Sequence, residues 1–158
     1  MKEKITVLIA DDNQEFSRTL ATYLRNQEDM EVIGIAKDGL EAVDLIKDKL
    51  PDIAILDVIM PHLDGLGVLE KVNNSSSELD KKPICIMLSA VGQDKITQKA
   101  ISLGAEYYMV KPFDIELLMQ RIREIKNFKP RSTRNNFIIR EPKRTPYVNI
   151  NSNKAEDN

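Results

Sequence analysis

The stretch "VLIADDNQ" (residues 7–14) begins as an apolar run and then reaches two adjacent carboxylates. Its apolar residues do not alternate with polar ones, which is typical of a strand covered on both faces of a parallel sheet. Asp11 and Asp12 then stand side by side where such a strand would emerge. Two like charges at one place repel each other, and removing them from water is costly. We therefore expect a positive group beside them.

Four later runs share this character, and together with the first they indicate the fold class. All are rich in Ile and Val, and segments with helical spacing separate them. The expected strands are "ITVLIA" (5–10), "VIGIA" (32–36), "IAIL" (53–56), "ICIML" (84–88) and "YYMV" (107–110). Strands that alternate with helices predict an α/β domain with a doubly wound, five-stranded parallel sheet and five helices. Tyr107 and Tyr108 are neighbours in the last strand, so we expect one in the core and one at the surface.

Charge divides the chain into two unequal parts. Of 158 residues, 42% are apolar and 30% charged, which is ordinary for a globular protein. The formal net charge of -2 combines 16 Lys/Arg against 22 Asp/Glu in residues 1–126 with 7 against 3 in residues 127–158. Prolines also interrupt the second segment. We expect a folded domain over 1–126, followed by a basic linker or disordered tail over 127–158.

The sequence favours a cytoplasmic protein without a membrane contact. Its apolar runs are far too short to span a bilayer, and acids end the first of them before it could serve as a signal peptide. The single cysteine, Cys85, cannot form an internal disulfide and lies within an apolar run. We interpret it as a small buried hydrophobe.

Polar side chains follow four of the five expected strands. Asp11 and Asp12 follow the first, Asp57 the third, Ser89 the fourth and Lys111 the fifth. In an open parallel sheet these ends meet at one edge, where ligands bind. Three carboxylates then face one ammonium, and a divalent cation would balance the charge. Oxygen ligands suit Mg²⁺, or another divalent cation such as Mn²⁺ or Ca²⁺, whereas a single histidine, His62, offers no zinc cluster.

Magnesium with open coordination positions beside a lysine suggests chemistry on a phosphoryl group. Asp57 stands alone at the expected sheet centre, while Asp11 and Asp12 together can hold the cation. Asp57 is therefore the candidate nucleophile, because aspartyl phosphate is an established kind of covalent intermediate. The added phosphoryl charge would need donors, and Ser89 and Lys111 are available for it.

These residues stand in motifs that resemble the receiver domain of two-component response regulators. The motifs are "ADDN" (10–13), "LDVIMPHLDG" (56–65), "LSA" (88–90) and "VKPF" (110–113), and the resemblance covers roughly residues 4–126. It implies a flavodoxin-like sheet with strand order 2-1-3-4-5. It also implies a phosphoacceptor switch rather than an enzyme, which takes its phosphoryl group from a histidine kinase or a histidine phosphotransferase.

The resemblance also assigns roles to individual residues. It implies that Asp57 accepts the phosphoryl group and that Lys111 pairs with it. It implies a switch in which a hydroxyl and an aromatic side chain move together, a metal site that includes one backbone carbonyl, and a cis peptide bond. These are, in order, Ser89 and Tyr108 for the switch, Asp11, Asp12, Asp57 and the Ile59 carbonyl for the metal, and Lys111–Pro112 for the cis bond.

Longer stretches are similar to the sporulation regulators of endospore-forming bacteria. They include "ADDNQEF" (10–16), "IMPHLDGLGVLE" (59–70) and "LGAEYYMVKPFD" (103–114). This similarity implies a regulator in a phosphorelay that forms a homodimer on phosphorylation and controls sporulation gene transcription. Binding to DNA would belong to a C-terminal domain that this sequence does not contain.

Three other interpretations remain open at this point. A stand-alone receiver would share the site and act through protein contacts only. A Mg²⁺-dependent phosphatase with a transient aspartyl phosphate would need a second acid just after the nucleophile, where this chain has Ile59. A flavin or nucleotide binder would need a hydroxyl-rich phosphate loop after the first strand, where the acids would instead repel phosphate.

Overall fold

The structure is a computed structural model, and it describes residues 3–75, 79, 81–90 and 92–127. Five strands alternate with five helices in these residues. The strands are β1 (Ile5–Ala10), β2 (Met30–Ala36), β3 (Ile53–Leu56), β4 (Ile84–Ser89) and β5 (Tyr107–Val110). The helices are α1 (Gln14–Arg25), α2 (Gly39–Lys49), α3 (Gly65–Asn74), α4 (Asp94–Ser102) and α5 (Ile115–Asn127).

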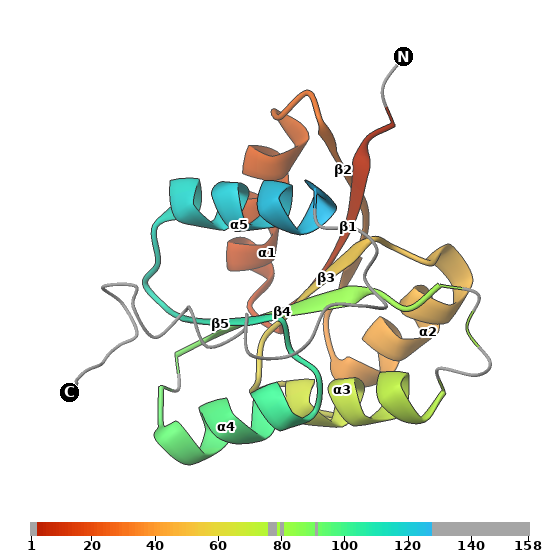
Figure 1. Cartoon of the computed structure of the whole chain (residues 1–158), viewed down its shortest axis with the longest axis vertical. Coiled ribbons are helices and arrows are strands. Elements are labelled where there is room, and N and C mark those ends of the chain that lie inside the picture. The colour runs from red at the N-terminus through yellow and green to blue at the C-terminus, as the bar shows by residue number, and fades with distance from the viewer. Residues whose placement is uncertain (1–2, 76–78, 80, 91, 128–158) are drawn as a thin grey trace.

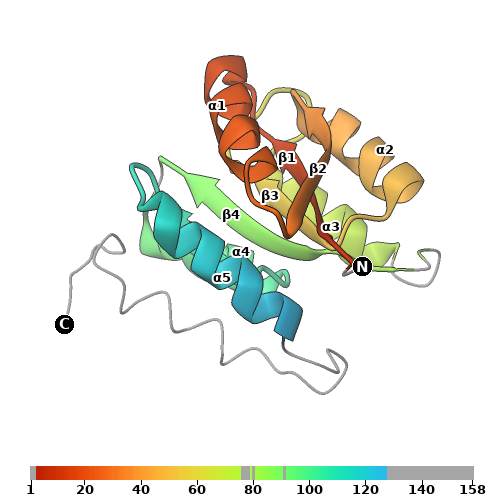
Figure 2. The same cartoon turned by 90° about the horizontal axis from the view of Figure 1, so that it is seen from above.

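The strands form a single parallel sheet in the order β2-β1-β3-β4-β5. This confirms the predicted fold class and strand order. Helices α1 and α5 cover one face of the sheet, and α2, α3 and α4 cover the other (Figures 1 and 2). The reversal of strand order lies between β1 and β3, so the crevice outside their carboxyl ends is where this fold places ligands.

Burial on both faces explains why the strands are apolar without alternation. In β1, Val7 and Ile9 belong to the core beneath α1 and α5, whereas Leu8 and Ala10 belong to the core beneath α2 and α3. All four are almost completely buried. Each strand thus supplies two hydrophobic cores at once, and removal of this apolar area from water is the main stabilising contribution to the fold.

Short polar side chains cap the first turn of the three helices that follow β1, β2 and β3. Asn13, Asp38 and Asp64 each adopt an extended backbone, and each side chain accepts a hydrogen bond from the backbone N–H three residues later. This satisfies a donor that the first helical turn would otherwise leave unpaired. The caps fix the loops at the carboxyl edge of the sheet, which carry the candidate site.

One expectation about β5 is wrong. Tyr107 and Tyr108 do face opposite sides of the sheet, but both are buried, with exposed fractions of 4% and 2%. Tyr107 lies in the core shared with α5, and Tyr108 lies in the other core. Although β5 is an edge strand, helices cover both of its faces, so neither ring reaches the surface.

Helix α5 ends at Asn127, close to the predicted domain boundary at residue 126. The predicted tail, residues 127–158, lies outside the described residues except for Asn127. In the part of the chain that the structure describes, no helix is long and apolar enough to cross a membrane.

Candidate functional site

Three carboxylates meet at the carboxyl edge of the sheet. Asp11, Asp12 and Asp57 each offer one oxygen atom, and these three atoms lie within 4.8 Å of one another. The sheet itself sets this spacing. The Asp57 N–H donates to the Ala10 carbonyl at 2.9 Å, and the Asp11 N–H donates to the Ala36 carbonyl at 3.1 Å. The backbones of Asp11 and Asp57 are therefore fixed by hydrogen bonds to the neighbouring strands.

Lys111 supplies the positive charge in this cluster. Its Nζ atom lies 2.7 Å from Asp11 Oδ2 and 3.4 Å from Asp57 Oδ2. The backbone places it there, because the Lys111 N–H donates to the Ser89 carbonyl at 2.8 Å and so continues the pairing of β5 with β4. The Lys111–Pro112 peptide bond is cis. The residues predicted from the ends of β1, β3 and β5 are thus brought together.

Burial makes the ionised form of Asp57 unfavourable. Removal from water raises the pKa of the Asp57 carboxyl, and the negative charge of Asp11 raises it further. Lys111, the Ile59 N–H and the Ser89 hydroxyl act in the opposite direction, but their combined effect is smaller. Three negative charges and one ammonium leave the cluster two charges short of neutrality. The donor set and this deficit both fit a divalent cation with oxygen ligands.

A line of hydroxyl groups connects Asp57 to the interior. Ser89 has no exposed surface, and its hydrogen bond lowers the pKa of Asp57. Burial raises the pKa of Tyr108 to about 12, with a further increase from the Asp57 charge, whereas hydrogen bonds with Ser89 and Thr97 lower it. The Tyr108 phenol therefore stays protonated at neutral pH and is linked through Ser89 to the acidic cluster and through Thr97 to α4.

The loop after β3 presents Ile59 at the mouth of the site. The Ile59 side chain is 58% exposed, which is unusual for a large apolar residue in the described part of the chain. Its N–H lies 3.4 Å from Asp57 Oδ1. At the other end of this loop, a Cβ on Gly65 would overlap the Asp57 carbonyl, so the start of α3 approaches the backbone of Asp57 as closely as only glycine permits.

Two features of the site were not predicted from the sequence. The Phe16 ring lies against the Lys111 ammonium, with 4.0 Å between Nζ and the ring centroid. His62 Nδ1 lies 2.9 Å from Asp38 Oδ2, which links the β3–α3 loop to the start of α2. Phe16 has the spacing of an ordinary core residue, and 24 residues separate His62 from Asp38. Neither pair therefore leaves a local signal in the sequence.

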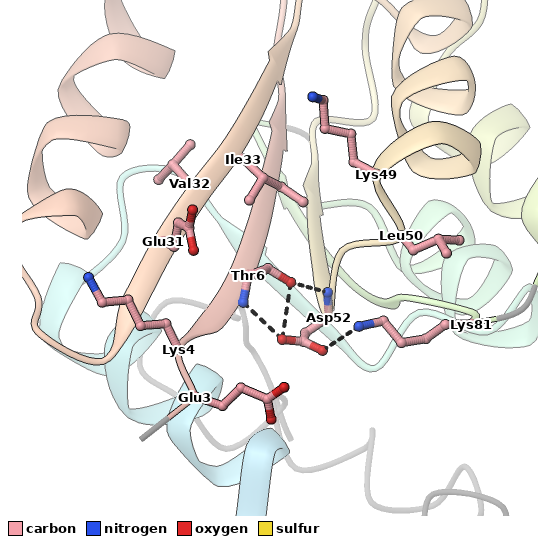
Figure 3. A pocket seen from close by; sticks show the side chains of 10 residues that line it. All are labelled: Glu3, Lys4, Thr6, Glu31, Val32, Ile33, Lys49, Leu50, Asp52 and Lys81. Atoms are coloured by element: carbon pink, nitrogen blue, oxygen red, sulfur yellow. Dashed lines mark hydrogen bonds and ion pairs between the residues drawn. The ribbon is translucent and has the colours of Figure 1, made fainter. Parts of the chain in front are cut away.

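A groove of about 800 Å³ lies at the other edge of the sheet, beside the amino ends of β1, β2 and β3. Figure 3 shows Asp52 at its centre, between Thr6 and Lys81. The Asp52 carboxylate accepts from the Thr6 N–H at 2.9 Å, the Thr6 hydroxyl at 3.1 Å and Lys81 Nζ at 2.8 Å. This carboxylate pairs with the Lys81 ammonium, so it does not share the charge deficit of the acidic cluster.

The same contacts give Asp52 a pH-dependent effect on stability. Burial raises the pKa of Asp52, but the hydrogen bonds from Lys81 and Thr6 outweigh it and leave the pKa below the usual value of 3.8. A depressed carboxyl pKa stabilises the fold above pH 3.8, and this contribution is lost as the pH falls through the lower pKa of the folded state.

We expect Asp52→Asn to lower the free energy of unfolding by about 1 kcal/mol at neutral pH, as for the loss of charge-assisted hydrogen bonds. The difference from wild type should shrink once the pH falls well below 3.8. Denaturant unfolding at a series of pH values measures both effects. Asp48→Asn, at an exposed acid of α2, is the matched control and should change little. A deficit that stayed constant down to the lowest pH would contradict the electrostatic explanation.

Comparison with known proteins agrees with this geometry. A family model described as the response regulator receiver domain matches residues 7–123, which contain every residue of the acidic cluster. The chain belongs to the response regulator receiver family. Family members are phosphoacceptor domains of two-component systems, and the predicted family is thereby confirmed.

Solved receiver structures support the assignment. The response regulator domain of CheB from Thermotoga maritima is 30% identical, covers 81% of this chain and 100% of its own, and superposes with a TM-score of 0.73. The receiver domain of the putative response regulator NarL from Mycobacterium tuberculosis is also 30% identical, covers 80% and 100%, and has the same TM-score. A chain of the CheX–CheY–BeF3–Mg²⁺ complex from Borrelia burgdorferi is 32% identical, with coverages of 80% and 92% and a TM-score of 0.69.

Proposed function

We propose that this receiver domain accepts a phosphoryl group on Asp57 and changes its protein contacts in response. The observation that carries the proposal is the position of Asp57, whose carboxylate lies beside those of Asp11 and Asp12 and 3.4 Å from the Lys111 ammonium. The raised pKa of Asp57 supports it, because a carboxylate that is unfavourable in its ionised form gains from a cation beside it. Asp11, Asp12 and Asp57, with the Ile59 carbonyl, are the ligands we propose for Mg²⁺, or for Mn²⁺ or Ca²⁺.

The proposed step transfers the group from a phosphohistidine of a histidine kinase or a histidine phosphotransferase. A carboxylate oxygen of Asp57 attacks phosphorus, an O–P bond forms, and the P–N bond to the donor imidazole breaks. The imidazole leaves with the electron pair of that bond and is protonated. When bound, the divalent cation neutralises charge on the phosphoryl oxygens. Lys111 holds a further oxygen through its ammonium group.

The added charge accounts for the proposed switch. Phosphorylation replaces one negative charge at Asp57 with about two, which creates a demand for hydrogen-bond donors. Ser89 is a buried hydroxyl that already hydrogen-bonds to Asp57, and Tyr108 hydrogen-bonds to both Ser89 and Thr97. A shift of Ser89 toward the phosphoryl group would change the position of Tyr108, and with it the face of α4, β5 and α5. We propose that this face then forms the homodimer.

The finer role that the sequence supports is control of sporulation genes. The stretches at residues 10–16, 59–70 and 103–114 resemble the stage 0 sporulation protein A. We infer a cytoplasmic phosphorelay regulator on this ground. Contact with DNA is proposed only through a C-terminal domain outside this sequence. A stand-alone receiver that acts by protein contacts is the alternative, because it would use the same site.

Incubation with acetyl phosphate tests the proposal. Intact-mass measurement should show one added phosphoryl group when Mg²⁺ is present and almost none when a chelator removes it. Hydroxylamine should remove the group, since it cleaves acyl phosphates but not phosphate esters of serine. Failure to gain mass under any divalent cation would overturn the proposal. Sustained turnover of a generic phosphate ester would instead favour the phosphatase, although Ile59 occupies the place where such enzymes need a second acid.

A further inference from the structure

One turn of backbone connects the acidic cluster to an aromatic ring. The Asn13 N–H donates to Asp11 Oδ1 at 2.9 Å, and the Asn13 side chain in turn accepts from the Phe16 N–H at 3.1 Å. Ser17, the next residue, donates from its hydroxyl to the Asp11 carbonyl at 3.3 Å. The position of the Phe16 backbone is therefore set by the same contacts that set Asp11.

The Phe16 ring is a third neighbour of the Lys111 ammonium, besides Asp11 and Asp57. The ammonium contacts the carboxylates of Asp11 and Asp57, and the centroid of the Phe16 ring lies 4.0 Å from Nζ. The ring also forms a T-shaped contact with the Phe113 ring, at a centroid distance of 6.1 Å and an interplanar angle of 76°. Because Phe113 follows Lys111 by two residues, this contact fixes the ring relative to the loop that carries the ammonium. Only 21% of the Lys111 side chain remains exposed.

A divalent cation bound at the acidic cluster would compete with the Lys111 ammonium for Asp11. The nearest contact of the ammonium is Asp11, at 2.7 Å, and Asp11 is a member of the cluster that would hold the cation. A carboxylate that binds a metal ion attracts an ammonium less strongly, because the metal neutralises part of its charge. The metal cation would also repel Nζ directly. Lys111 would then need a second favourable contact to stay within reach of Asp57. The face of an aromatic ring provides one, because its negative quadrupole attracts a cation without competing as a metal ligand.

We propose that Phe16 is a positioning residue, which holds the Lys111 ammonium beside Asp57 while the divalent cation occupies Asp11. This inference rests on the proposed function, since the position matters only if Asp57 receives a phosphoryl group. Phe16 also packs against the core beneath α1 and α5, so a contribution to stability is expected as well. The experiment must therefore separate the electrostatic role of the ring from its packing.

The test measures the rate of phosphorylation by acetyl phosphate at saturating Mg²⁺, by intact mass. Phe16→Leu keeps an apolar side chain but removes the ring face, and should slow the reaction roughly three- to tenfold, the range expected for a partly buried cation–π contact. Phe16→Tyr should retain a rate close to wild type. Replacement of Phe16 by phenylalanines with one, two and three ring fluorines keeps the shape and weakens the quadrupole, so the rate should fall with each fluorine.

Two controls identify the partner of the ring. Tyr23→Leu removes a ring from the same helix that packs on the same core and whose hydroxyl donates to Glu116, and it should leave the rate unchanged. In a Lys111→Gln background, Phe16→Leu should have no further effect, because the cation is gone. An equal rate in wild type and Phe16→Leu, a flat fluorine series, or the same slowing in the Lys111→Gln background would overturn the inference. Wild type that gains no phosphoryl group would overturn the proposed function itself, which distinguishes the two failures.

Discussion

Asp57→Asn should abolish the phosphoryl adduct that wild type forms with acetyl phosphate and Mg²⁺. The asparagine side chain has nearly the same shape, so the fold should persist, but its amide oxygen is a poor nucleophile and carries no charge. The backbone hydrogen bond that places Asp11 does not involve residue 57, so a residual cation site is expected. Intact mass should show no added group at incubation times that saturate wild type.

The matched control is Asp64→Asn. Asp64 lies in the same loop but caps α3, with its side chain accepting from the Gly67 N–H at 2.8 Å. Asparagine caps helices about as well as aspartate, so this variant should be phosphorylated like wild type. An adduct of wild-type yield on Asp57→Asn would show that another residue accepts the group, and peptide mapping would locate it. Loss of the adduct in both variants would point instead to a disturbed loop.

Gly39→Ala should destabilise the fold by about 3 kcal/mol, at the upper end of the usual cost of overpacking. Gly39 is the first residue of α2, where helix propensity alone would favour alanine over glycine by up to about 1 kcal/mol. Tertiary contact reverses this preference. A Cβ at residue 39 would overlap the Leu63 carbonyl and would lie 2.8 Å from Leu63 Cβ. Backbone cannot move aside as a flexible side chain can, so one of the two loops must shift.

Denaturant unfolding measures the loss, and Gly34→Ala in β2 is the control. A Cβ at residue 34 would meet the methyl groups of Leu8 at 3.1 Å and of Leu45 at 3.4 Å, which are ends of flexible side chains. We expect Gly34→Ala to cost about 1 kcal/mol or less, because rotamer changes can relieve the contact. If Gly39→Ala were as stable as wild type, the close approach between the start of α2 and the β3–α3 loop would be contradicted.

The strands and the acidic edge were predictable because simple rules place them. A sheet covered on both faces produces apolar runs without alternation, as in residues 53–56. Parallel strands bring their carboxyl ends to one edge, and this alone predicts that Asp11, Asp57 and Lys111 meet. The structure places the Lys111 ammonium within ion-pair distance of both carboxylates.

The same rules do not predict contacts between loops that are distant in the sequence. The side chain of Phe16 has the period of a core residue, and nothing in the sequence shows that Lys111 lies over its ring. Periodicity predicted correctly that Tyr107 and Tyr108 diverge, but it does not reveal that helices cover both sides of an edge strand. The approach of Gly39 to Leu63 likewise depends on how two loops pack, which local spacing does not determine.

The two adjacent tyrosines of β5 anchor that strand in the hydrophobic cores on both faces of the sheet. Because Tyr107 is anchored among the residues of α1 and α5 and Tyr108 among those of α2, α3 and α4, a displacement of the backbone between them must disturb both layers together. If Asp57 is phosphorylated as proposed, a movement of Ser89 that reaches the backbone of β5 would alter the packing on both faces of the sheet, and so could change two separate surfaces at once.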